Sequence, residues 1–150
     1  MPSWGHVPHH FFVAYEKEND AWIKFDVVTD LRYGRPVRAF RINLAESCLR
    51  QRRRVGRTYV LSPEDEFITL ILHCLLDKTA TEPGHRARLT LLREQLENDH
   101  GALERAHRGV QRYLAPAITW AFLTEVIHDQ KWELLERRRA ALARQLSWRE

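Results

Sequence analysis

HHFFVAYEKENDAWIKFDVVTD, residues 9–30, contains two runs of strand-forming residues that flank a charged turn. The first run, 11–15, is aromatic and β-branched, and the second, 21–28, resumes with the same residue types. Between them, residues 16–20 carry charge and an Asn-Asp turn signal. The pattern predicts a β-hairpin over residues 10–28, and a hairpin alone is marginally stable in water, so we expect one or two further strands beside it.

Asp26 is the residue of this hairpin that strand formation by itself does not explain. Side chains alternate across a strand, so Trp22, Lys24 and Asp26 share one face while Ile23 and Phe25 share the other. A buried carboxylate costs several kcal/mol unless it is paired or bound to a metal. Two interpretations follow: Asp26 pairs with Lys24 on an exposed face, or it is an Mg²⁺ ligand in a phosphoryl-transfer site.

The bulk properties are those of one soluble globular domain, residues 1–150. The chain is 44% hydrophobic and 29% charged, and no apolar run approaches the roughly 20 residues of a membrane span. We find no secretory signal, and Cys48 and Cys74 fit neither a disulfide framework nor a metal spacing. We therefore expect a cytoplasmic protein with reduced thiols. The net charge of +4 favours anionic partners but does not by itself indicate nucleic acid.

Two regions follow from the pattern along the chain: a sheet region over 1–61 and a helical region over 62–150. In the first, 37–42 predicts a strand, an arginine-rich helix is expected to stop at Gly56, and 58–61 predicts an extended run. In the second, Ser62-Pro63 is a strong helix start. The helix that follows is apolar nearly all round, which predicts a central buried helix containing Leu72 and Leu75. Further helices are expected over 85–98 and 103–114, from residue 116, and over 132–146. The predicted class is α+β: a short antiparallel sheet followed by an α-helical half.

Arginines in the sheet region form the second candidate site. Arg50, Arg52 and Arg53 lie close together in sequence, and guanidinium groups bind triphosphates or a nucleic-acid backbone well. The alternative is a solvated helix end, where cations are favoured by the helix dipole.

His73 and Asp77 lie four residues apart on one helix face and could bind a metal, although a buried His–Asp hydrogen bond is the commoner arrangement.

A resemblance to a known family rests on three blocks in order: WIKFDVVTDLRYG at 22–34, CLRQRRR at 48–54 and LSPEDEFITLILHCLLDK at 61–78. Together they resemble the uncharacterised bacterial nucleotidyltransferase-like proteins of the DNA polymerase β superfamily. Some relatives of that group are fused to thymidylate-kinase-like domains. The resemblance covers about residues 4–98. It implies that Asp26 matches the third catalytic carboxylate of the superfamily and ligates Mg²⁺.

One part of the family pattern is missing. The first two catalytic carboxylates of the superfamily follow a Gly-Ser turn, and this sequence contains no Gly-Ser dipeptide. The resemblance therefore implies the C-terminal portion of a larger protein or a degenerate copy.

The resemblance implies a partial or degenerate nucleotidyltransferase-like protein. With its missing part supplied, the protein would use Mg²⁺ to transfer a nucleoside monophosphate from an NTP to an acceptor. Asp26 would be the metal ligand, and Lys24, Arg50, Arg52 and Arg53 would contact phosphate. The alternative is a non-catalytic interaction module that docks a partner chain. Unpaired strand edges favour such a partner, an upstream segment or self-association in either case.

Overall fold

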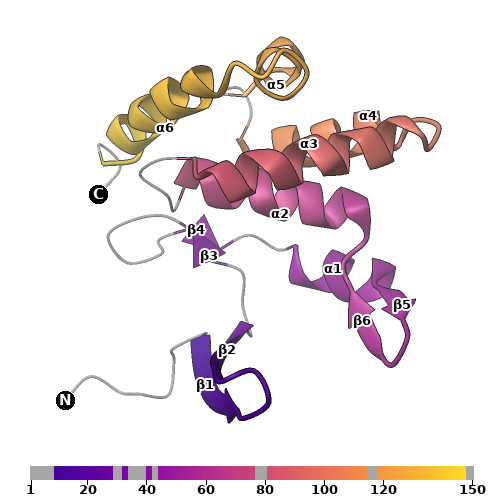
Figure 1. Ribbon diagram of the computed structural model, residues 1–150. Coiled ribbons are helices and arrows are strands. Elements are labelled where there is room, and N and C mark those ends of the chain that lie inside the picture. The colour runs from indigo at the N-terminus through magenta and orange to yellow at the C-terminus, as the bar shows by residue number, and fades with distance from the viewer. Residues whose placement is uncertain are drawn as a thin grey trace.

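The computed structural model describes residues 9–28, 32–33, 40–41, 44–76, 81–114 and 118–147. In these ranges four of the six strands precede the first helix, the other two lie between the first and second helices, and a helical half follows. This order confirms the predicted α+β class (Figure 1). The strands are β1 (His9–Glu16), β2 (Ala21–Val28), β3 (Arg32–Tyr33), β4 (Phe40–Arg41), β5 (Arg53–Val55) and β6 (Thr58–Val60). The helices are α1 (Ala45–Gln51), α2 (Pro63–Leu76), α3 (Pro83–Glu97), α4 (Ala102–Leu114), α5 (Trp120–Ile127) and α6 (Trp132–Ser147).

The predicted hairpin is present as β1 and β2, which pair antiparallel from His9 opposite Val28 to Glu16 opposite Ala21. Its turn is held by the Glu16 carboxylate, which accepts hydrogen bonds from the backbone N–H groups of residues 18 and 19 at 2.9 and 3.0 Å. Asp20 has φ 50°, a left-handed conformation that aspartate tolerates better than most residues. Local turn chemistry therefore fixes the register of this hairpin.

Further strands are present, but they do not extend the hairpin. The described strands form three separate two-stranded sheets, β1–β2, β3–β4 and β5–β6. Of the strand expected over 37–42, residues 40–41 are described as β4, paired with β3. The expected arginine-rich helix is wrong in its second half, because α1 ends at Gln51 and β5 begins at Arg53. Strand-forming Val55 and Thr58 flank a turn in which Gly56 has φ 58°, so a short hairpin replaces the last helical turn.

Helix α2 is the centre of the helical half, as predicted. Ser62 caps it, since its Oγ accepts a hydrogen bond from the Asp65 N–H at 3.1 Å. Leu72 and Leu75 are buried, and α2 packs against α1, α3, α4 and α6. Its contact with α4 depends on Gly109, because a β-carbon there would collide with the Ile68 side chain.

The later helices lie close to their predicted ranges. The largest difference concerns the helix expected from residue 116, whose helical turns start at Trp120 instead. Thr119 caps this helix, since its Oγ1 accepts a hydrogen bond from the Phe122 N–H at 3.2 Å. None of the helices within the described ranges is both long and apolar enough to span a bilayer.

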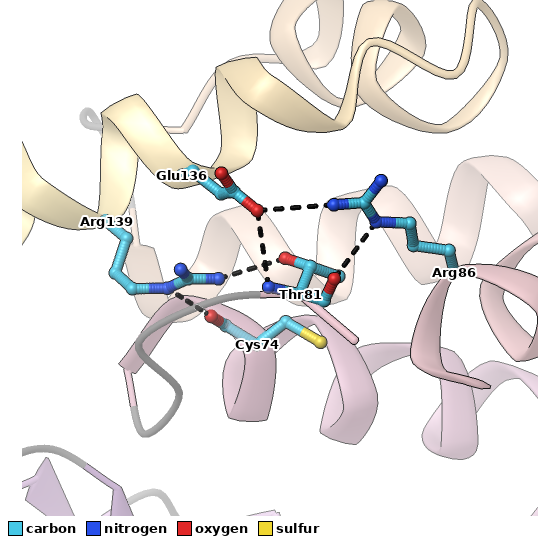
Figure 2. A network of polar contacts seen from close by, with 5 residues as sticks. All are labelled: Cys74, Thr81, Arg86, Glu136 and Arg139. Atoms are coloured by element: carbon cyan, nitrogen blue, oxygen red, sulfur yellow. Dashed lines mark hydrogen bonds and ion pairs between the residues drawn. The ribbon is translucent and has the colours of Figure 1, made fainter. Parts of the chain in front are cut away.

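A buried arginine joins α6 to the end of α2 (Figure 2). The Arg139 guanidinium donates to the Cys74 carbonyl at 2.7 Å and to Thr81 Oγ1 at 3.0 Å. Arg86 donates to the Thr81 carbonyl at 3.0 Å and pairs with Glu136 at 3.3 Å. The Cys74 carbonyl lies in the last turn of α2, where helical partners are missing, so Arg139 supplies a donor that the helix itself lacks.

Candidate functional site

Asp26 lies in the middle of β2, opposite Phe11 of β1. Its position in an eight-residue strand agrees with the sequence prediction, and Lys24 lies two residues before it on the same face. The Lys24 side chain is exposed. The side chain of Asp26, and all of Asp77, lie outside the described part of the structure.

The hairpin that carries Asp26 exposes apolar side chains. Trp22 is 73% exposed and Val13 is 63% exposed. Phe12, Tyr15, Ile23 and Val27 are also exposed, and together these residues belong to both faces of the hairpin. Among the described elements, β1 and β2 pack extensively only on each other, and Figure 1 shows them apart from the helices. The described part of the chain therefore gives this hairpin no core of its own.

The three arginines predicted to bind phosphate have different surroundings. Arg50 lies on α1 and pairs with Glu46 at 3.1 Å. The Arg52 guanidinium donates to the Leu49 carbonyl and lies 4.9 Å from the centre of the Tyr59 ring. Arg53 is exposed on β5. Neither α1 nor β5 packs against β2, so the described structure does not bring these arginines together with Asp26.

Arg50 instead lines a pocket of about 520 Å³ between α1, α2 and α4. The opposite wall is α4, which contributes Arg105, Arg108 and Arg112. Their spacing of three and four residues places all three on one helix face. We did not predict this row from the sequence, although the same spacing was a signal that could have revealed it.

Ion pairs occupy most of these guanidinium groups. Arg105 donates to Glu64 of α2 at 2.7 Å, and Arg108 pairs with Glu104 one turn earlier on α4. Within the described part of the chain, no carboxylate pairs with Arg112. The pocket thus combines paired cations with one unpaired cation.

Asp65 is the buried acid of this pocket. It is 2% exposed; its Oδ1 accepts a hydrogen bond from Ser47 Oγ at 3.3 Å, whereas its Oδ2 is buried without a partner. Burial raises the pKa of the Asp65 carboxyl. Burial, with Asp65 as the second cause, raises the pKa of the Cys48 thiol to about 11. The Cys48 thiol is therefore protonated at neutral pH.

His73 and two tryptophans pack among the helices. His73 meets the edge of the His85 ring, with the ring centres 5.6 Å apart. Trp132 is buried, and the Trp120 ring packs against His107 with the centres 4.5 Å apart. No group of three potential metal-ligating side chains occurs among the described residues.

His107 is a buried histidine that we did not single out from the sequence. It is 3% exposed, lies between the Phe67 and Trp120 rings, and has no hydrogen-bond partner at either ring nitrogen. Burial lowers its pKa to about 4. The imidazole is consequently neutral in the folded protein at neutral pH.

We expect His107 to make folding stability depend on pH. Its pKa is lower in the folded chain than the ordinary value of 6.5, so the unfolded chain binds more protons between these values. The contribution of neutral His107 to the free energy of unfolding is fully present above about pH 6.5. It falls by on the order of 2–3 kcal/mol as the pH drops toward 4. Urea titrations of wild type and His107→Leu across this range measure the difference.

The matched control for this prediction is His100→Leu, since His100 is exposed. It should keep the pH dependence of the wild type, whereas His107→Leu should flatten it and leave only the part due to the other titratable groups. Parallel pH profiles for wild type and His107→Leu would show that His107 is not the group responsible.

Comparison with known proteins gave no match: no protein-family model, no curated protein and no solved structure matches the chain.

Proposed function

We propose that this chain is part of a nucleotidyltransferase-like protein whose catalytic sheet is completed by strands added to the hairpin β1–β2. The completed site would use Mg²⁺ to transfer a nucleoside monophosphate from an NTP to an acceptor. Asp26 would serve as one metal ligand, and Lys24 on the same strand face would contact phosphate. The missing carboxylates would come from the added strands, whether they belong to an upstream segment or to a partner chain.

The exposed hairpin is the observation that carries this proposal. Apolar side chains on both of its faces remain exposed among the described residues, although a two-stranded hairpin needs neighbours to be stable. Strands added at its edges would satisfy unpaired backbone N–H and C=O groups and cover side chains such as Trp22. The same addition could place carboxylates next to Asp26, which is what a two-metal site requires, since each Mg²⁺ needs several oxygen ligands.

A transfer assay tests the proposal. We expect no transfer by the purified chain with any labelled NTP and Mg²⁺, and transfer once a cell lysate supplies the completing strands and the acceptor. Asp26→Asn keeps the shape but removes the charge, so it should reduce this activity by at least about 100-fold, because even indirect partners of a metal ligand contribute 10- to 100-fold. Asp20→Asn, the same change in the turn of the hairpin, should leave activity unchanged.

Two outcomes would contradict the proposal. Robust transfer by the purified chain would show that no added strand is needed. Equal lysate-dependent transfer by wild type and Asp26→Asn would show that Asp26 is not a metal ligand.

A non-catalytic interaction module is the second candidate, and the same exposed hairpin supports it. In this case strand addition docks a partner, or a second copy of the chain, without any chemistry. The transfer assay separates the two functions, because an interaction module binds its partner yet transfers no nucleotide. Replacing exposed Trp22 by lysine should then weaken partner binding while the helical half stays folded.

A further inference from the structure

The pocket between α1, α2 and α4 has a composition that suits one class of ligand. Its lining has four basic residues and three acidic ones: Arg50, Arg105, Arg108 and Arg112, and Glu46, Glu64 and Asp65. Its volume of about 520 Å³ lies within the roughly 300–1,000 Å³ typical of small-molecule sites. An inorganic anion alone would leave most of this space unused.

An incoming anion can still bind here, because the ion pairs that Arg50 and Arg108 make are exposed. Arg112 has no carboxylate partner among the described residues, so an anion that binds Arg112 breaks no ion pair there. Arg50 and Glu46 have side chains that are 70% and 76% exposed, and exposed pairs of this kind contribute little to stability. A phosphate dianion offers guanidinium groups stronger, bidentate hydrogen bonds than such pairs do.

Asp65 adds a second requirement. A buried polar atom without a hydrogen bond is unfavourable, and Asp65, a residue of the pocket lining, has such an atom in Oδ2. A hydroxyl or amino group of a ligand could donate the missing hydrogen bond once the side chain turns this oxygen toward the pocket. The lining therefore suits a ligand with an anionic group at the α4 arginines and a hydrogen-bond donor near the start of α2.

We propose that this pocket binds a small phosphate monoester that carries hydroxyl groups, the chemistry shared by sugar phosphates and nucleotides. The phosphate lies against Arg112 and Arg108, and a ligand hydroxyl donates to Asp65. The site consists of α1, α2 and α4 only, and it is independent of nucleotidyl transfer at the hairpin. Failure of the transfer assay would leave this proposal standing, and the reverse also holds.

Titration calorimetry at low ionic strength tests the site with three probes: inorganic phosphate, ribose 5-phosphate and adenosine 5′-monophosphate. We expect ribose 5-phosphate to bind with a Kd below about 1 mM and more tightly than inorganic phosphate. Comparing the two esters shows whether the ligand is a sugar phosphate or a nucleotide. Binding should weaken as salt is added, since the arginines are exposed.

Variants assign the binding to this pocket. Arg112→Gln should weaken the binding of ribose 5-phosphate by about tenfold or more, the usual effect of losing a charge-assisted contact. Arg137→Gln, an exposed arginine of α6 outside the pocket, should bind as the wild type does. Asp65→Asn should reduce the preference for ribose 5-phosphate over inorganic phosphate. Because Asp65 is buried, circular dichroism must confirm its fold, and the exposed Arg112 decides the proposal alone if it does not fold.

Three results would overturn the proposal. The first is no binding heat with any of the three probes at concentrations of about 10 mM, well above the expected Kd. The second is equal binding by wild type and Arg112→Gln. The third is tighter binding of inorganic phosphate than of both esters, which would show that the pocket does not select the organic part.

Discussion

Replacing Leu72 by alanine is expected to lower the free energy of unfolding by about 2–5 kcal/mol. Leu72 is fully buried in α2, the helix against which α1, α3, α4 and α6 pack. The substitution removes apolar surface from the core and leaves a cavity that rigid neighbouring helices can fill only in part. Urea or thermal unfolding followed by circular dichroism measures the change.

Leu91→Ala is the matched control for this prediction. Leu91 lies on α3 and is 44% exposed, so the same substitution should cost well under the Leu72 value. A loss below about 1 kcal/mol for Leu72→Ala, or similar losses for the two variants, would contradict the central position of α2.

Arg139→Met is expected to cost on the order of 3 kcal/mol, because removing one partner from a buried polar network leaves the others unsatisfied. Without the guanidinium, the Cys74 carbonyl and Thr81 Oγ1 each lose the donor that Arg139 supplies. Methionine keeps much of the apolar stem, so the loss reports mainly on the hydrogen bonds. Denaturant unfolding at neutral pH gives the value.

Two further variants make the Arg139 result specific. Arg139→Lys keeps the charge, but its single ammonium group cannot reproduce the planar fork that reaches two acceptors, so we expect a loss between wild type and Arg139→Met. Arg137→Met on the same helix should be near neutral, since Arg137 is exposed. Equal stability of Arg139→Met and Arg137→Met would mean that the network shown in Figure 2 does not hold α6 in place.

Local patterns were sufficient for the elements that local chemistry sets. The alternation and turn signal of residues 9–30 predicted the β1–β2 hairpin, and Ser62-Pro63 predicted the start of α2. The arginine-rich segment is the instructive failure. The helix was predicted to run up to Gly56, whereas α1 ends at Gln51, and Gly56, with its positive φ, lies in the turn between β5 and β6. The hairpin turn outweighed the good helical propensity of the arginines before it.

The candidate sites divide in the same way. Asp26 was found from the sequence because a carboxylate in an apolar strand is a local anomaly, and its role as a metal ligand remains a prediction. Arg50 was found too, but its neighbours in space were not: Arg105, Arg108 and Arg112 come from a helix more than fifty residues later in the chain. A pocket formed by three helices has no signature in any single segment.

The sequence by itself determined the α+β order, the hairpin and the buried character of α2, because turn chemistry and apolar periodicity act over a few residues. Only the tertiary structure decided which polar groups became buried together. Arg139 meets Thr81 across 58 residues, and His107 loses its hydrogen-bond partners between Phe67 and Trp120. Such encounters depend on how helices pack, and the packing is set by the fit of many apolar side chains at once.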